Sequence, residues 1–351
     1  MSLAGKILGA AAGAVGLAAA AGAAEIVRLN RVIGNRSAGE RFVFGELRSA
    51  PRVVVTDDSV DLHVEIDEPA DFGGEATTDD SLTVIFVHGY SLNLDCWHFQ
   101  RAAYRGQVRT VFYDQRSHGR SARSSEDNAT IDQLGRDLQR VIEDTSPGRC
   151  VVVGHSMGGM SVISLADQFP ELFGDKVIGT ALISTTAGGL DPGRILFPMV
   201  PLGLGGTVVG RVVRTLDRGH RVVDAARSWG HAVADVVTDR YAFGDDVPAD
   251  YVEFVYSMLN ATPFAVVADF YPAFATLDKF ETLEPLSRVP TAIVCGTEDK
   301  VTSVGHSRKL HSRIAGSSLL ECEGAGHMVI LERHDQVTAE LDDLISLAMG
   351  E

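Results

Sequence analysis

A serine flanked by glycines is the first feature of the chain that could carry out chemistry. Residues 154–158 form a G-x-S-x-G pattern centred on Ser156, between the apolar run CVVVG and the helix-like run MGGMSVISLADQF. A serine at such a strand-to-helix turn projects its hydroxyl, and the start of a helix favours negative charge nearby. The pattern in this context predicts that Ser156 is a nucleophile, whereas the pattern alone would indicate a helix N-cap.

A histidine and an acid that could activate Ser156 lie much farther along the chain. A serine hydroxyl needs a base to take its proton and an acid to hold that base. The run TAIVCG leads into Asp299, and the run SLLECE leads into a glycine-rich loop with His327. Both residues would follow the carboxyl ends of strands, where open α/β sheets bind ligands. We predict a catalytic triad of these three residues, with Glu298 as the competing acid and His334 as the fallback base.

Two backbone N–H groups are candidates for an oxyanion hole. Acyl transfer requires hydrogen-bond donors for the negative charge that develops on the attacked carbonyl oxygen. One donor would be Met157, directly after the nucleophile, and the other Tyr90, in the loop after the run LTVIFV. The preceding His88-Gly89 also fits a tight turn that leaves a strand, which is compatible with this function.

Apolar strand-like runs alternate with helical patterns through most of the chain. The runs cover residues 82–87, 110–113, 150–154, 177–184, 291–296 and 318–323. Continuous apolar runs of this length suit strands that are buried on both faces. Residues 52–67 indicate an opening hairpin, and residues 130–144 an amphipathic helix with Thr130 as its N-cap. The alternation predicts a doubly wound α/β fold.

The alternation stops after Ser184 and resumes near Val289. The interval is rich in glycine and proline at first and then shows helical patterns, including residues 222–237 and 250–264. We therefore expect a helical cap inserted into a single catalytic core. The predicted boundaries are residues 1–40 for an Ala/Gly-rich segment and linker, 41–185 and 286–351 for the two parts of the core, and 186–285 for the cap.

Composition and charge exclude several classes of partner. The formal net charge of −16 would repel a phosphate backbone, so we expect no nucleic acid partner. The four cysteines (Cys96, Cys150, Cys295 and Cys322) are scattered without a CxxC pair, which argues against a metal site. Buried reduced thiols are the simplest account, although Cys295 and Cys322 could lie on neighbouring strands and pair.

The N-terminal segment leaves three alternatives open. Residues 7–24 are uncharged, about the minimum length for a membrane-spanning helix, and ten of them are alanine. The segment could be a membrane anchor, a cleaved signal peptide or a loose helix on the protein body. Arg28, Arg31 and Arg36 follow it, and this bias favours an anchored protein with its catalytic domain on the cytoplasmic side. Cytoplasmic and secreted locations are the alternatives.

Five segments resemble the successive signatures of the α/β-hydrolase superfamily: HGYSLNLDCW, DQRSHGRS, GHSMGG, GTEDKV and GAGHM, within residues 85–328. The chain looks most like capped esterases, lipases and cofactor-free haloperoxidase-like members. The resemblance implies a mostly parallel eight-stranded sheet with helices on both faces and an inserted helical cap. It also implies the triad and oxyanion roles given above, no cofactor, and structural roles for Asp114 and His118. Because the nucleophile is a serine and not an aspartate, the epoxide hydrolase and haloalkane dehalogenase branches are disfavoured.

The leading functional hypothesis is hydrolysis of carboxylic esters or thioesters through a covalent acyl-enzyme. The apolar cap residues 195–210 and the candidate anchor favour a small-molecule ester with a hydrophobic acyl group. Perhydrolysis of the haloperoxidase type and carbon–carbon bond hydrolysis are alternatives on the same triad. A binding module on a hydrolase scaffold is the non-enzymatic alternative.

Overall fold

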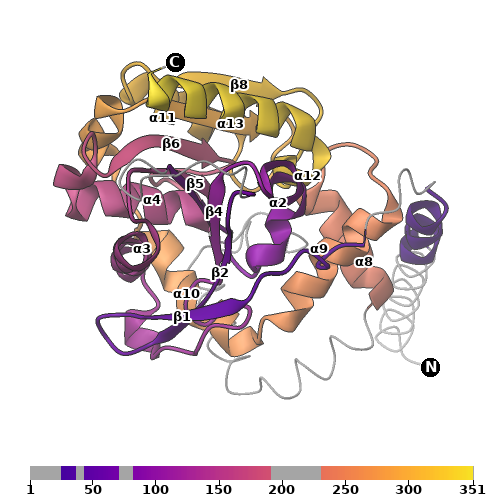
Figure 1. Ribbon diagram of the computed structural model, residues 1–351. Coiled ribbons are helices and arrows are strands. Elements are labelled where there is room, and N and C mark those ends of the chain that lie inside the picture. Colours follow the sequence, from indigo (N-terminus) through magenta and orange to yellow (C-terminus); the bar gives the residue numbers. More distant parts are fainter. Residues whose placement is uncertain (1–24, 37–42, 71–81, 191–230, 351) are drawn as a thin grey trace, which may run out of the picture.

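The computed structural model describes residues 25–36, 43–70, 82–190 and 231–350 (Figure 1). Three sequence predictions fall wholly or partly outside these residues: the candidate anchor at 7–24, the apolar cap stretch at 195–210, and the first half of the helical pattern at 222–237. Within the described residues, no helix is both long and apolar enough to cross a membrane.

In the described part of the chain, eight strands form one sheet in the order β1-β2-β4-β3-β5-β6-β7-β8. Their bounds are β1 Pro51–Val55, β2 Asp61–Asp67, β3 Thr83–Val87, β4 Arg109–Tyr113, β5 Cys150–His155, β6 Val177–Ile183, β7 Thr291–Gly296 and β8 Ser318–Cys322. β1 and β2 form the predicted antiparallel hairpin, β2 also runs antiparallel to β4, and all remaining pairs are parallel. The predicted fold class, a mostly parallel α/β sheet, is confirmed.

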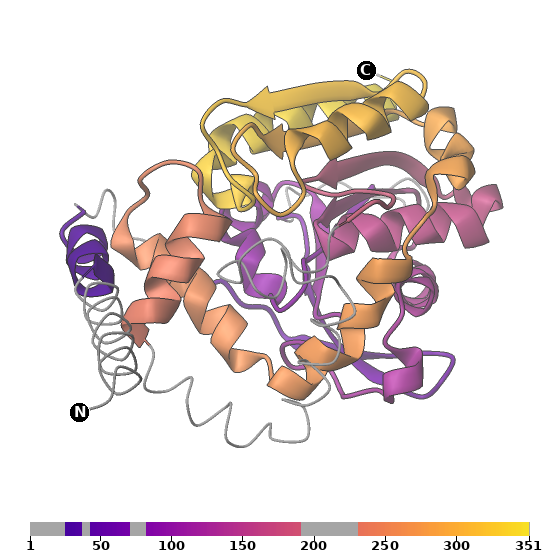
Figure 2. The ribbon, with the colours of Figure 1, turned by 180° about the vertical axis from the view of Figure 1, so that it is seen from behind.

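Helices cover both faces of this sheet (Figures 1 and 2). Their bounds are α2 His98–Tyr104, α3 Ile131–Thr145, α4 Met157–Gln168, α11 Val304–Arg313, α12 Val329–Glu332 and α13 His334–Met349. Apolar side chains of α2, α12 and α13 form one core layer, and those of α3, α4 and α11 form the other. Every residue of β3, β5, β6 and β7 is buried. Burial on both faces explains why these strands are continuously apolar in the sequence.

Helix α3 follows its sequence pattern closely. The side chain of Thr130 accepts a hydrogen bond from the N–H of Gln133 at 3.1 Å, as expected of an N-cap. The predicted stripe is buried: Ile131, Leu134, Leu138, Val141 and Ile142. Local propensity and tertiary packing therefore agree in this element.

Among the described residues between β6 and β7 lie three α-helices: α8 His231–Ala242, α9 Ala249–Ala261 and α10 Phe264–Thr276. One prediction here needs correction, because the helical pattern over 250–264 is broken. Thr262 precedes Pro263 and has φ −79° and ψ 119°, so α9 ends before it and α10 begins after it. A proline disfavours helical geometry in the residue that precedes it, which is the physical reason for the break.

All four cysteines are buried and unpaired. Cys295 on β7 lies opposite Glu321 on β8, while Cys322 lies opposite Gly296. Successive side chains of a strand point to opposite faces of the sheet, so the register sends the two thiols to different sides. The structure thus decides against the disulfide that the sequence left open.

A helix over residues 25–34 precedes the core and lies beside α8 in both views (Figures 1 and 2). Ile33 is buried in the core layer. Arg36, just beyond the helix, donates to Asp239 of α8 at 3.1 Å. Residues 25–36 are therefore attached to the core through Ile33 and to α8 through Arg36.

Candidate active site

Ser156 occupies a sharp turn between β5 and α4. Its backbone angles are φ 54° and ψ −118°, a conformation that costs energy for any residue with a side chain. The flanking glycines are required by close approach. A Cβ atom on Gly158 would lie 2.1 Å from the carbonyl oxygen of Val87, and one on Gly154 would lie 2.6 Å from that of Gly158. The crowding of this turn therefore explains the two glycines of the G-x-S-x-G pattern.

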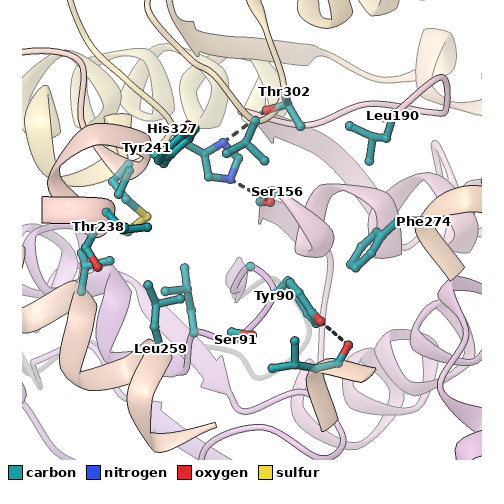
Figure 3. A pocket seen from close by; sticks show the side chains of 18 of the residues that line it. Tyr90, Ser91, Ser156, Leu190, Thr238, Tyr241, Leu259, Phe274, Thr302 and His327 are labelled. Atoms are coloured by element: carbon teal, nitrogen blue, oxygen red, sulfur yellow. Dashed lines mark hydrogen bonds between the residues drawn. The ribbon is translucent and has the colours of Figure 1, made fainter. Parts of the chain in front are cut away.

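The structure brings together the three residues of the predicted triad. The Nε2 atom of His327 lies 3.0 Å from the Oγ of Ser156 (Figure 3). Its Nδ1 atom lies 2.9 Å from the Oδ2 of Asp299. Each residue follows the carboxyl end of a strand: Ser156 follows β5, His327 follows β8 and Asp299 follows β7. The three strands run parallel, so these three loops meet at one edge of the sheet.

The carboxylate of Asp299 is fully buried, and both of its oxygens accept hydrogen bonds. It accepts hydrogen bonds from the N–H of Val301 at 2.8 Å, the N–H of Thr302 at 2.9 Å and the hydroxyl of Thr302 at 2.8 Å. Burial raises the pKa of Asp299, but His327, Thr302 and Val301 together outweigh it and hold the pKa below its usual value. Asp299 is therefore ionised at neutral pH, which keeps the Nδ1–H of His327 directed towards it.

The structure also places the two competing residues. The side chain of Glu298 is exposed, and its backbone N–H bonds to the carbonyl of Ala325 at 2.9 Å. His334 stacks on Phe99, with ring centroids 3.9 Å apart, and its Nδ1 faces Asp335. Neither side chain hydrogen-bonds to Ser156 or His327.

His155 is a residue near the nucleophile that sequence reasoning did not single out. Its Nε2 donates to the carbonyl oxygen of His327 at 2.9 Å. Burial, reinforced by the nearby His327, lowers the pKa of His155 to about 3, so the ring is neutral. The G-x-S-x-G pattern leaves this position unspecified and therefore carried no signal for the contact. His155 ties the turn of Ser156 to the backbone of its base.

The loop after β3 passes close to Ser156. A Cβ atom on Gly89 would lie 3.1 Å from the Cβ of Ser156, so the peptide that leads to Tyr90 approaches the serine closely. Gln115 holds the loop by donating its N–H to the Nε2 of His88 at 2.9 Å and its side-chain amide to the carbonyl of His88 at 2.6 Å. Met157, the other predicted donor, is the first residue of α4. N–H groups in the first turn of a helix have no partner within the helix.

A pocket of about 410 Å³ opens above Ser156 (Figure 3). From the core, it is lined by Gly89, Tyr90, Ser91, Leu92, Ser156, Met160, Val301, Thr302, His327 and Met328. From the segment between β6 and β7, it is lined by Leu190, Val237, Thr238, Tyr241, Ala242, Val255, Leu259, Phe264, Val267 and Phe274. The hydroxyl of Tyr90 donates to the carbonyl of Val267, which joins the two walls. Most of the lining is apolar.

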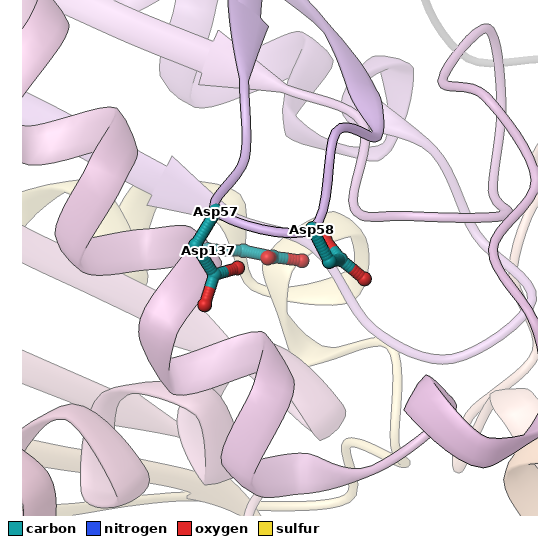
Figure 4. A group of neighbouring side chains, drawn as sticks. All are labelled: Asp57, Asp58 and Asp137. Carbon is teal, nitrogen blue, oxygen red and sulfur yellow. The ribbon is translucent and has the colours of Figure 1, made fainter.

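Among the described residues, one acidic group has the spacing of a metal site: Asp57, Asp58 and Asp137 (Figure 4). Arg116 offsets part of its negative charge, because its guanidinium donates to Asp58 at 2.8 Å and to Asp137 at 2.6 Å. Gln133 bonds to Asp57 at 2.9 Å. These contacts connect the β1–β2 turn to α3 and account for the cluster without an ion.

Asp114 and His118, for which the family resemblance implied structural roles, are both buried. The carboxylate of Asp114 accepts the N–H groups of Leu94 and Arg120, each at 2.8 Å. The Nδ1 of His118 lies 2.9 Å from the carbonyl oxygen of Arg116. Neither residue lines the pocket above Ser156.

Comparison with curated proteins finds relatives among hydrolases. Epoxide hydrolase 1 of Caenorhabditis elegans is 35% identical over 102 residues, which are 29% of this chain and 25% of that protein. The match thus spans only about a quarter of that relative. 3-oxoadipate enol-lactonase 2 of Acinetobacter baylyi is 25% identical over 257 residues, which are 72% of this chain and 85% of that protein.

Solved structures and a family model give the broader assignment. A thermophilic esterase from Thermogutta terrifontis has the same fold, with a TM-score of 0.66 at 19% identity over 86% of this chain and 99% of that one. A model of the alpha/beta hydrolase family matches residues 84–341, which include Ser156, Asp299 and His327. Because this match covers most of the chain, the protein belongs to the alpha/beta hydrolase family.

Proposed function

We propose that the protein is a serine hydrolase that cleaves carboxylic esters or thioesters with a hydrophobic acyl group. One observation carries the proposal: Ser156 and His327, which form a hydrogen-bond chain with Asp299, line an apolar pocket. Two of the similar proteins are named as an enol-lactonase and an esterase, and these names agree with the proposed reaction class.

The geometry supports a two-step acyl transfer. The Oγ of Ser156 attacks the carbonyl carbon of the substrate and passes its proton to the Nε2 of His327. Asp299 stabilises the resulting imidazolium, while the N–H groups of Tyr90 and Met157 donate hydrogen bonds to the developing oxyanion. His327 then gives its proton to the departing alcohol or thiol, leaving an acyl-enzyme.

Water completes the cycle. His327 takes a proton from a water molecule, whose oxygen attacks the acyl carbon of the acyl-enzyme. The tetrahedral intermediate collapses, the bond to the Oγ of Ser156 breaks, and His327 returns the proton to the serine. The products are a carboxylic acid and the regenerated enzyme.

The pocket supports the preference for hydrophobic acyl groups. His327 must protonate the leaving group, so the leaving group lies on the histidine side of Ser156 and the acyl group on the other. On that other side, Leu190 and Phe274 face the pocket (Figure 3). A volume of about 410 Å³ lies within the range of small-molecule sites, and apolar walls favour the burial of apolar substrate surface.

The test is hydrolysis of p-nitrophenyl esters of increasing acyl length by the parent protein and by Ser156→Ala. We expect activity that rises with acyl length up to the capacity of the pocket and that falls by roughly 10⁴-fold or more in the variant. Equal activity in both proteins would refute the assignment of the nucleophile. A preference for short, polar esters would refute the hydrophobic acyl group.

We also propose that residues 7–24 attach the protein to a membrane with the catalytic domain on the cytoplasmic side. The support is their uncharged composition and the arginines that follow them. The test is sedimentation of the full chain with lipid vesicles, beside a chain that begins at Glu25. Binding by the full chain alone is expected, and equal sedimentation of both chains would contradict the proposal.

A further inference from the structure

Glu332, at the end of α12, places its carboxylate between two segments that are far apart in the sequence. Its Oε1 accepts the N–H of Gly326 at 2.6 Å. Its Oε2 accepts the N–H of Gly244 at 3.1 Å and that of Asp245 at 3.2 Å. One segment immediately precedes His327, and the other is the turn that leaves α8. One side chain therefore binds the loop of the base to the helices that cover the pocket.

The two segments are in backbone contact where Glu332 holds them. A Cβ atom on Gly326 would lie 2.5 Å from the nitrogen of Gly244, and one on Gly244 would lie 2.1 Å from the carbonyl oxygen of Gly324. Beside this contact, the N–H of Met328 donates to the carbonyl of Ala242 at 2.8 Å. The glycines permit the approach but contribute no side chain to maintain it.

Both sides of this junction reach the pocket. His327 follows Gly326 directly, and Tyr241 and Ala242 of α8 line the pocket two or three residues before Gly244. A shift at the junction would therefore move the imidazole relative to Ser156 and move the wall relative to the substrate. The 3.0 Å contact between Nε2 and Oγ depends on the placement of this loop.

We infer that Glu332 is a positioning residue for the proposed ester hydrolysis. Its carboxylate fixes the positions of both His327 and the C-terminal end of α8. The inference rests on the proposed function. A carboxylate is suited to this task because it has only acceptors and can receive all three N–H groups. A glutamine of the same shape would turn an NH₂ group towards backbone donors and leave at least one of the three N–H groups without its present acceptor.

The inference is tested with Glu332→Gln, with the shorter carboxylate Glu332→Asp, and with Glu323→Gln as a matched control. Glu323 is an exposed carboxylate on the same loop. Two readouts are compared at a temperature at which circular dichroism shows every variant folded. They are the second-order rate at which a fluorophosphonate labels Ser156, and kcat and KM for a p-nitrophenyl ester.

We expect Glu332→Gln to lower both the labelling rate and kcat by roughly 10- to 100-fold, because small misplacements of catalytic groups have effects of this size. KM should change less than kcat, Glu332→Asp should lie between parent and Gln variant, and Glu323→Gln should match the parent. Should Glu332→Gln not fold, Glu332→Asp alone carries the test, with a labelling rate below that of the parent.

Two results would overturn the inference. One is a folded Glu332→Gln that labels at the parent rate. The other is a loss of activity that follows only the unfolded fraction and is not recovered by Glu332→Asp, which would indicate a purely structural role. A parent protein that does not react with the fluorophosphonate at all would instead refute the proposed function, so the two failures are distinguishable.

Discussion

The carboxyl edge of the sheet and the segment between β6 and β7 build two walls of one pocket by different means. At the sheet edge, short loops after buried strands hold Ser156, Asp299 and His327 through short hydrogen bonds and glycine contacts. The opposite wall consists mainly of apolar side chains on helices, such as Leu259 and Phe274. The proposed chemistry and the proposed choice of substrate therefore reside in separate parts of the chain.

The largest expected effect lies at the sheet edge. Asp299→Asn should lower kcat for an ester by roughly 10³- to 10⁴-fold, because an amide no longer stabilises the imidazolium and can favour the wrong tautomer of His327. Glu298→Gln is the matched control and should change kcat less than about twofold, since its side chain is exposed. Steady-state kinetics measures both. A larger loss in Glu298→Gln would reassign the acid.

The second effect probes how closely the turn of Ser156 is packed. Gly158→Ala should lower the free energy of unfolding by about 3 kcal/mol, because a Cβ there would lie 2.1 Å from a backbone oxygen of β3. Gly305→Ala on α11 meets its nearest side-chain atom at 3.7 Å and should be neutral or stabilising. Urea denaturation measures both changes. Equal stabilities would mean that the turn relaxes more easily than its contacts indicate.

The third effect concerns the other wall. Leu190→Trp should lower the ratio of kcat/KM for long over short acyl esters by roughly 10-fold, because the larger side chain occupies space on the acyl side of Ser156. The rate of fluorophosphonate labelling should stay near that of the parent. Leu347→Trp, at an exposed position on α13, is the control. A collapse of activity towards every ester would contradict the separation of the two walls.

The smallest effect is a pH dependence located in the core. Burial lowers the pKa of His118 to about 3 and that of His88 to about 4, below the ordinary value of 6.5. Below pH 6.5 the unfolded chain therefore binds protons that the folded chain does not. The stability from these neutral rings is complete above pH 6.5 and is lost as the pH falls towards 4.

In that window, each buried histidine contributes a slope of about 1.4 kcal/mol per pH unit to the free energy of unfolding. His118→Gln should reduce the total slope between pH 6.5 and 4.5 by about this amount, whatever its stability at neutral pH. Urea titrations at several pH values measure the slope, and identical slopes in parent and His118→Gln would contradict the prediction.

Much of the fold could be predicted from the sequence because its signals are local. Strands buried on both faces must be apolar at every position, and the amphipathic stripe of α3 follows from one buried helix face. The crowded turn at Ser156 admits only glycine at positions 154 and 158, so it left a readable pattern. The break at Pro263 could not be read from the apolar pattern, because that pattern continues across residues 262 and 263 while the helix ends before them.

Only the tertiary structure decided the questions that depend on long-range contacts. Glu298 and Asp299 are adjacent in the sequence, and strand register and loop geometry place only Asp299 against His327. The same register separates the thiols of Cys295 and Cys322.

The contacts of His155 and Glu332 join loops that are distant in the chain, so no local sequence pattern predicts them. The sequence by itself therefore determined which residue types could perform the chemistry and which elements carry them. Their distances, their protonation and their supporting contacts arise from packing between segments far apart in the sequence, which only the folded chain brings together.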